Sequence, residues 1–481
     1  MSAATADTVE EKGHVAHTKQ ADAKGLAGKM RRPIKVAMLG AGSGFTPTIT
    51  RDIFQIPGSL GGTIALVDID ENRLKTMHQV ISKMASLIKE DTGIEWKVEA
   101  STNRLDVLAG TDYIVVCVEV SGTACVRFDN DIPAKYGIDQ CIGDTIGPGG
   151  LFKALRTVPV FLEILKDAER LCPNVTVLNY TNPMNIMCLS AGRSSRIPVV
   201  GLCHSVQGTS HLLAKRAGVA YDEMTWECAG INHLAWFTKL EHQGKDLYPL
   251  LFEKAQQDVY GDKLVDETDG DIVRKDMMLH FGAFITESSG HLSEYLPYYR
   301  KRKDLLEKYS RTGYEGGSSF YADNWPTWRQ NADAHRLKLV SGEEKIGWDR
   351  SWEYGSWIIE AREKDSPYRI HGNVMNNVGG AGQLITNLPA DGCVEVSCLI
   401  DQNGINPTRY GKLPAQMAAV CASNMGVFDL AATACIEKSK EAAIYALQLD
   451  PLSAAVCSPN EIKRMTLELF EAEAAFLPGF K

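Results

Sequence analysis

The feature that most constrains the fold is an alternation of short apolar runs and helical patterns that begins at Pro33. Residues 34–39 and 63–67 are nearly continuous apolar runs, which are typical of strands buried on both faces of a parallel sheet. An amphipathic helical pattern occupies about residues 72–88, and another apolar run covers 113–118. Because this alternation continues to about residue 200, the sequence predicts an α/β fold with a Rossmann-like, doubly wound parallel sheet.

The pattern changes after about residue 200, where strand-like runs such as 393–400 are separated by long helical stretches such as 424–446. A chain of 481 residues is also too long for one simple core. We therefore expect a Rossmann-like domain over 31–200 and an α+β domain over 201–481 that completes the active site. Residues 1–30 are polar and aperiodic, which indicates a flexible tail, an oligomer arm, or sequence upstream of a start at Met30.

Charge, hydropathy and cysteine usage exclude several classes of protein. The formal net charge is −9, with the basic residues scattered, which argues against a nucleic-acid partner. No run approaches the ~18 consecutive apolar residues of a membrane span. The twelve cysteines contain no CxxC pair and no dense framework, so reduced thiols and a cytoplasmic location are expected.

A glycine-rich loop follows the first predicted strand. Gly40 and Gly42 match the first two positions of G-x-G-x-x-G, whereas Phe45 occupies the third. Asp68 ends the next strand, where a carboxylate accepts hydrogen bonds from the adenosine ribose and favours NAD over NADP. A tight strand-to-helix turn without a ligand is the alternative. The predicted NAD site comprises Gly40, Gly42, Ser43, Gly44, Phe45, Asp68 and Arg73.

Two apolar stretches carry polar residues that suit a divalent metal. Cys203 and His204 follow an apolar run at 198–202, and Asn232 and His233 interrupt the apolar stretch 229–237. A thiolate and an imidazole form half of a metal site and leave positions for substrate oxygens. A buried thiol beside a core histidine is the alternative interpretation.

Three further segments are expected as loops at the carboxyl edge of the sheet, where ligands bind in open α/β sheets. Residues 143–150 are rich in glycine and proline and contain Asp144, and 179–184 place Asn182 after a strand. Residues 286–299 mix acids, a histidine and aromatic side chains. The alternatives are a plain turn, a helix cap by Asn182, and an exposed loop with packed aromatic rings.

Together these segments resemble glycoside hydrolase family four, the NAD- and manganese-dependent glycosidases, from about residue 35 to residue 480. The resemblance rests on the motifs GAGS, DTIGPGG, NYTNP, CHSV, GINHLAWF and EYLP, in that order. It implies that NAD removes a hydride from C3 of the sugar, that a base removes the C2 proton, and that the aglycone leaves by elimination before water and the hydride return. It also implies a homodimer or homotetramer.

The resemblance assigns roles to individual residues. Cys203 and His233 are expected to bind Mn²⁺, Tyr295 to act as the base at C2, and His204 to be the candidate acid. Cys203–Val206 is similar to the α-galactosidase group of the family. The remaining predicted site residues are Asp144, which approaches the sugar and metal, and Asn182, Arg127 and Arg300, which contact the substrate.

Three alternatives remain open at this point. The same mechanism on an anionic glycoside, an α-galacturonide, α-glucuronide or sulfoquinovoside, would use Arg127, Arg300 and Arg302 to hold the acid group. A 2-hydroxy-acid dehydrogenase of the lactate or malate type would produce NADH and would not need Cys203. A non-catalytic NAD-sensing protein would bind NAD without proton exchange at C2.

Overall fold

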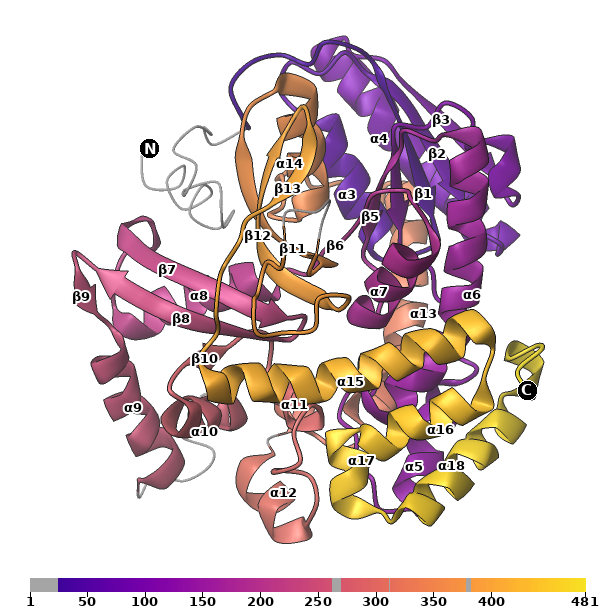
Figure 1. Ribbon diagram of the computed structural model, residues 1–481. Helices are drawn as coiled ribbons and strands as arrows, with labels where there is room; N and C mark the ends of the chain where they lie inside the picture. Colours follow the sequence, from indigo (N-terminus) through magenta and orange to yellow (C-terminus); the bar gives the residue numbers. More distant parts are fainter. Residues whose placement is uncertain (1–24, 262–269, 311, 378–381) are drawn as a thin grey trace.

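The structure, a computed structural model, describes residues 25–261, 270–310, 312–377 and 382–481. One mixed sheet of 13 strands runs through it in the order β10-β8-β7-β12-β11-β6-β5-β4-β1-β2-β3, with β13 beside β12 and β9 beside β8. In Figure 1 the helices of the N-terminal half surround one end of this sheet, and the C-terminal helices α15 to α18 lie together below it.

The N-terminal half of the sheet is parallel and confirms the predicted doubly wound order. Its strands are β1 (Ile34–Leu39), β2 (Gly62–Val67), β3 (Trp96–Ser101), β4 (Tyr113–Val116), β5 (Thr176–Asn179) and β6 (Val199–Gly201). β3 was not predicted from the sequence. This strand lies at the sheet edge and is only partly buried, so it lacks the continuous apolar run that revealed its neighbours.

The helices of the N-terminal half lie around the parallel strands or beside them. They are α3 (Phe45–Phe54), α4 (Glu71–Thr92), α5 (Val126–Lys135), α6 (Gly147–Leu171), α7 (Met184–Ser194) and α8 (Ser205–Ala217), with the short η1 (Arg104–Asp106). Local chemistry sets the ends of α4, because the Asp70 carboxylate caps its first turn and Gly93 ends it at φ 74°. The expected loop 143–150 is wrong in its second half. Residues 147–150 form the first turn of α6, where Pro148 is favourable because that turn lacks intrahelical N–H partners.

The C-terminal half adds antiparallel strands to the same sheet. They are β7 (Met224–Ile231), β8 (Leu234–His242), β9 (Lys245–Asp246), β10 (Phe284–Ile285), β11 (Tyr368–Met375), β12 (Cys393–Asp401) and β13 (Gly404–Pro407). β11 joins the two halves by pairing Asn373 with Gly201 of β6. The apolar stretch 229–237 contains the end of β7, the turn at Asn232 and His233, and the start of β8, which pair as an antiparallel hairpin. The domain limits 31–200 and 201–481 stay a prediction.

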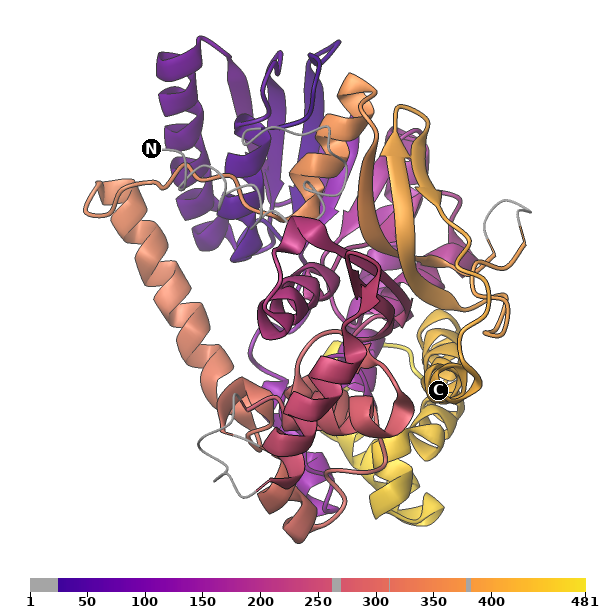
Figure 2. The same ribbon diagram turned by 90° about the vertical axis from the view of Figure 1, so that its left-hand side faces the viewer.

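The remaining helices follow or separate these strands. They are η2 (Tyr221–Glu223), α9 (Tyr248–Tyr260), α10 (Ile272–Phe281), α11 (Ser289–Glu294), α12 (Lys303–Tyr309), η4 (Gly313–Glu315), α13 (Phe320–Ser341), α14 (Tyr354–Lys364), α15 (Ala415–Glu437), α16 (Lys440–Leu449), α17 (Pro451–Val456), α18 (Pro459–Ala472) and η5 (Ala474–Phe476). The expected loop 286–299 thus contains the short helix α11. Figure 2 shows α13 running along one side of the molecule, and Arg73 of α4 pairs with Asp333 of α13 at 2.7 Å.

Two further expectations concern α15 and the N-terminal tail. Within the described residues, α15 is the one helix long and apolar enough to cross a membrane, but half of its apolar window is buried, as in core helices. Residues 1–24 of the predicted tail lie outside the described residues. Leu26 and Met30 correct that prediction because both are buried, and the Leu26 N–H donates to Glu360 Oε1 of α14 at 2.8 Å.

Candidate active site

The predicted metal ligands meet where two elements of the sheet end. Cys203 follows β6, and His233 lies in the tight β7–β8 turn with φ 61°, in the left-handed region. The Cys203 Sγ and His233 Nε2 atoms are 3.4 Å apart, and Sγ also lies 3.3 Å from Ser205 Oγ. The sheet thus brings together two side chains that are 30 residues apart in the chain.

The chemistry of this pair suits a divalent cation. Metal bonds of ~2.3 Å to sulfur and ~2.1 Å to nitrogen put two ligands of one ion about as far apart as Sγ and Nε2 are here. Burial and then His291 lower the pKa of His233 to about 3, which keeps its imidazole neutral and able to coordinate. Burial and Glu395 raise the pKa of Cys203 to about 12, so a thiolate needs a positive charge beside it. No set of three Cys, His, Asp or Glu side chains in the described chain has the geometry of a metal site, so the protein offers two donors.

A row of charged side chains lies next to the Cys203–His233 pair. His291 of α11 stands between two carboxylates, with Nδ1 3.1 Å from Glu287 Oε2 and Nε2 3.6 Å from Asp144 Oδ1. Its ring meets the His233 ring edge-on at a centroid distance of 4.5 Å. Although burial lowers the pKa of His291, Glu287 and Asp144 outweigh it and hold that pKa well above the usual value. Neither Glu287 nor His291 had a role predicted from the sequence.

Asp144 connects this row of charged side chains to Asn182, which was predicted to bind the substrate. Asn182 Nδ2 donates to Asp144 Oδ2 at 3.2 Å, and the Lys153 ammonium lies 3.5 Å from the same oxygen. Lys153 also pairs with Glu119 at 3.0 Å. Burial raises the pKa of Asp144, but Lys153 and His291 outweigh burial and lower it. Sequence reasoning missed Lys153 and Glu119; a lysine inside the apolar start of α6 was the available signal.

Tyr295 and His204 occupy different environments. Tyr295 is buried at the end of α11, its ring centroid 6.5 Å from that of His233. Burial raises the pKa of Tyr295 well above its usual value, so its hydroxyl acts as a base only beside a positive charge. The His204 side chain is half exposed at the start of α8, and its Nδ1 lies 3.6 Å from Glu353 Oε1. Sequence reasoning did not identify Glu353.

The glycine loop has the close approaches that a dinucleotide site requires. Gly40 has φ 78°, and a Cβ there would lie 2.4 Å from the Cys117 carbonyl oxygen. A Cβ on Gly42 would lie 2.8 Å from Asp68 Oδ2, which accepts the Gly42 N–H at 2.7 Å. Gly44 faces open space at the start of α3, so the helix N-terminus is accessible to a phosphate.

The other predicted members of the NAD site have partners within the protein. Ser43 Oγ accepts the Phe45 N–H at 3.2 Å, and the Phe45 side chain is about one-third exposed. Arg73 pairs with Asp333, which ties α13 to this part of the fold. The loop, helix start and carboxylate therefore fit a dinucleotide, while Arg73 joins two helices.

The two arginines predicted to contact the substrate, Arg300 and Arg127, form ion pairs with residues outside the Cys203–His233 cluster. Arg300 is fully buried and donates to the Asp139 carbonyl at 3.0 Å, to the Asp139 carboxylate and to Ser293 Oγ at 3.1 Å. These contacts favour a structural role over the predicted contact with substrate, because they direct the guanidinium into the protein. Arg127 is half exposed and pairs with Asp323 at 2.7 Å.

Replacing Arg300 with methionine is expected to lower the free energy of unfolding by about 3–5 kcal/mol, because Asp139 loses its buried cation. Urea unfolding measures this change. Arg302→Met is the matched control, since that exposed side chain pairs with Asp304 in solvent and its loss changes stability little. If Arg300→Met instead kept full stability and raised KM, the substrate contact would be the better assignment.

Two family models match the chain. The model described as "Family 4 glycosyl hydrolase" matches residues 35–219, and the one described as "Family 4 glycosyl hydrolase C-terminal domain" matches residues 228–453. Together they include every predicted site residue.

Individual proteins are also similar to this chain over most of its length. An α-galactosidase of Rhizobium meliloti is 35% identical over 457 residues, which are 93% of this chain and 89% of that protein. An α-galacturonidase of Lachnoclostridium phytofermentans is 28% identical and covers 92% of this chain and 97% of its own length. A 6-phospho-α-glucosidase from gut microorganisms, solved in complex with NAD and Mn²⁺, has a TM-score of 0.75 at 20% identity and covers 94% and 100% of the two chains.

Proposed function

Because the chain belongs to glycosyl hydrolase family 4, we propose that it hydrolyses α-galactosides with NAD and Mn²⁺ as cofactors. The α-galactosidase relative is more similar than the α-galacturonidase, which supports a neutral galactoside. The fit of the glycine loop to a dinucleotide and of the Cys203–His233 pair to a cation supports the two cofactors. The family match disfavours the dehydrogenase and the NAD-sensing protein.

The preference for a neutral sugar rests on the ion pairs that the cationic side chains already form with carboxylates of the protein. Arg127 pairs with Asp323, Arg300 with Asp139, and Lys153 with Glu119. The carboxylate of a uronide would therefore meet the carboxylates of Asp144 and Glu287, while these three described cations already have carboxylate partners, which raises the cost of its desolvation. Sugar hydroxyls exchange hydrogen bonds with such paired charges without adding a net charge.

The proposed mechanism assigns one task to each side chain of the cluster. Asn182 and Asp144 hydrogen-bond the sugar hydroxyls, and Cys203 and His233 hold Mn²⁺. Tyr295 removes the C2 proton, and His204, held beside Glu353, protonates the departing oxygen. When bound, NAD accepts and returns the C3 hydride, and the metal stabilises negative charge on the sugar oxygens.

The test compares nitrophenyl α-galactoside with nitrophenyl α-galacturonide, each with and without NAD, Mn²⁺ and chelator. We expect kcat/KM to be about tenfold or more higher for the galactoside, because the uronide carboxylate would compete with Asp323, Asp139 and Glu119 for cations that these residues already pair. Hydrolysis should need both NAD and Mn²⁺ and should release no net NADH. Faster cleavage of the galacturonide would transfer the proposal to the anionic sugar, and activity in excess chelator would contradict the metal site.

Two further proposals concern the state of the protein. We expect it to work in a reducing cytoplasm, since oxidation of Cys203 would remove a metal ligand, and reductant should restore such activity. A homodimer or homotetramer is expected in solution, and light scattering measures it.

A further inference from the structure

Two arginines lie beside Asp68, the carboxylate expected to hold the adenosine ribose of NAD. Asp68 Oδ2 accepts the Gly42 N–H at 2.7 Å, and a Cβ on Gly42 would lie 3.2 Å from both Cβ and Cδ of Arg73. The Arg73 side chain of α4 therefore runs past the same glycine that Asp68 contacts. Arg336 is the second arginine, and the packing of α13 against α4 brings it to this end of the fold.

Both guanidiniums bind one carboxylate, that of Asp333 on α13. Arg73 Nη2 lies 2.7 Å from its Oδ2, and Arg336 Nη1 lies 2.6 Å from its Oδ1. Asp70 Oδ2 lies 3.7 Å from Arg73 Nε, which is beyond hydrogen-bond distance. Burial and Arg73 lower the pKa of Arg336. Asp333 and Asp68 oppose that shift, so the two arginines and these two carboxylates form one electrostatic cluster.

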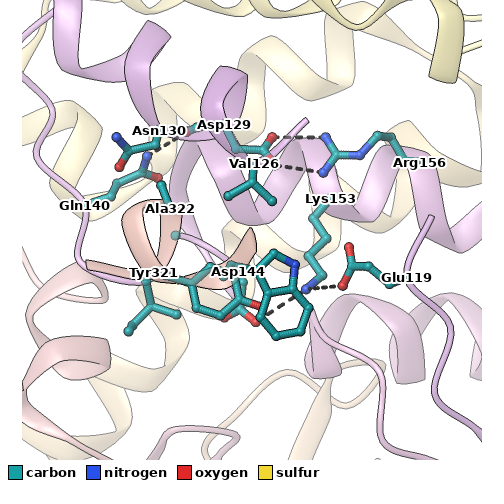
Figure 3. A pocket seen from close by; sticks show the side chains of 13 residues that line it. Glu119, Val126, Asp129, Asn130, Gln140, Asp144, Lys153, Arg156, Tyr321 and Ala322 are labelled. Atoms are coloured by element: carbon teal, nitrogen blue, oxygen red, sulfur yellow. Dashed lines mark hydrogen bonds and ion pairs between the residues drawn. The ribbon is translucent and has the colours of Figure 1, made fainter. Parts of the chain in front are cut away.

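This cluster has the opposite charge balance to the one around Lys153. Figure 3 shows the single ammonium of Lys153 beside two carboxylates, those of Glu119 and Asp144. At Asp333, two guanidiniums instead share a single carboxylate. The side chains of Arg73 and Asp333 are 18% and 35% exposed, so a ligand can reach them. The charge of Asp333 therefore decides how strongly this end of the site attracts an anion.

We propose that Asp333 helps to exclude NADP, because it holds the Arg73 and Arg336 guanidiniums that would otherwise bind the 2′-phosphate of that cofactor; the inference rests on the proposed function. NADP differs from NAD by this phosphate on the adenosine ribose, at the hydroxyl that a carboxylate such as Asp68 contacts. A phosphate monoester carries a charge of about −1.5 to −2 at neutral pH, and guanidinium groups bind it through paired hydrogen bonds. Asp68 repels the phosphate directly, whereas Asp333 acts through the two arginines.

The experiment measures the Kd of NADH and of NADPH by fluorescence titration of the full-length protein. Asp68→Ser, which removes the direct repulsion, is the background. Adding Asp333→Asn releases both guanidiniums at nearly constant side-chain size, so the Kd of NADPH is expected to fall about tenfold further. The Kd of NADH should change less than about twofold, because NADH has no 2′-phosphate. Adding Arg73→Met to the double variant should cancel most of the gain in NADPH affinity.

Asp167→Asn is the matched control, because Asp167 of α6 also pairs with two arginines, Arg104 at 2.7 Å and Arg170 at 3.1 Å. In the Asp68→Ser background it should leave both Kd values unchanged. If Asp333→Asn lowered the Kd of NADH as much as that of NADPH, it would act on the whole dinucleotide. If it left the Kd of NADPH unchanged, Asp333 would not restrain the arginines. Either result would overturn the inference.

Two further measurements separate the inference from folding and from cofactor binding. If Asp68→Ser fails to fold, Asp333→Asn alone decides by the same comparison of NADPH with NADH. If the wild-type protein binds neither dinucleotide, the proposed function fails separately. Calorimetry of 2′,5′-ADP, which carries the same 2′-phosphate, with wild-type and Asp333→Asn protein then tests the arginines. Tighter binding to the variant would support their role, and equal affinities or no binding to either protein would refute it.

Discussion

Replacing Cys203 with serine is expected to lower kcat on an α-galactoside at least about a hundredfold at saturating NAD and moderate Mn²⁺. The Cys203 Sγ lies 3.4 Å from His233 Nε2, so it supplies one of the two protein donors proposed for the metal. A serine hydroxyl stays protonated and binds such an ion weakly. Titrating Mn²⁺ into the variant measures the lost affinity, and fluorescence of bound NADH checks that the cofactor site is intact.

Cys457→Ser is the matched control for this prediction, since Cys457 is partly exposed at the end of α17 and outside the proposed site. We expect that variant to keep wild-type activity and Mn²⁺ dependence. A Cys203→Ser protein with an unchanged Mn²⁺ requirement would remove the thiol from the metal site. A variant that loses its thermal transition would instead identify Cys203 as a buried structural residue.

Tyr295→Phe is expected to lower kcat about 10²- to 10⁴-fold, the range typical of a lost general base. Because burial raises the pKa of Tyr295, its function depends on positive charge beside it, and phenylalanine removes the ionisable group without changing the packing. Hydrolysis in D₂O provides a second measurement: the sugar released by the wild type should carry deuterium at C2, and unreacted substrate incubated with the variant should not exchange.

Tyr298→Phe controls for the loss of a nearby tyrosine hydroxyl, because Tyr298 lies three residues away and is 40% exposed. This control should behave as the wild type in both rate and deuterium content. If Tyr295→Phe still introduced deuterium at C2 at the wild-type rate, another group would be the base and the assignment of Tyr295 would be wrong.

Local sequence predicted those parts of the fold whose cause is local. The continuous apolar runs of β1, β2 and β4 and the capped amphipathic helix α4 follow from side-chain periodicity, and the structure confirms them. The edge strand β3 was not predicted, because its half-exposed residues do not form an apolar run. The Gly- and Pro-rich segment 143–150 was wrongly expected to be a loop throughout, since Pro148 is as compatible with a first helical turn as with a loop.

The family resemblance, which the family models confirm, identified candidate site residues, which hydrophobic periodicity cannot identify. It singled out Cys203, His233 and Tyr295 as members of one site, and the structure brings these three side chains together. It also proposed Arg300 as a substrate contact, and the buried Arg300–Asp139 pair argues against that role. A motif identifies residue types at positions but does not say which atoms face a cavity.

By itself, the sequence determined the α/β class, the glycine loop with its trailing Asp68, and the polar residues at the ends of apolar runs, because each depends on spacing within a short segment. Only the tertiary structure decided which charges are paired. Lys153 lies between Glu119 and Asp144, and His291 lies between Glu287 and Asp144. The Lys153–Glu119 and His291–Asp144 contacts join segments far apart in the chain, and the free energy of a buried charge depends on the atoms around it in space, which no local pattern encodes.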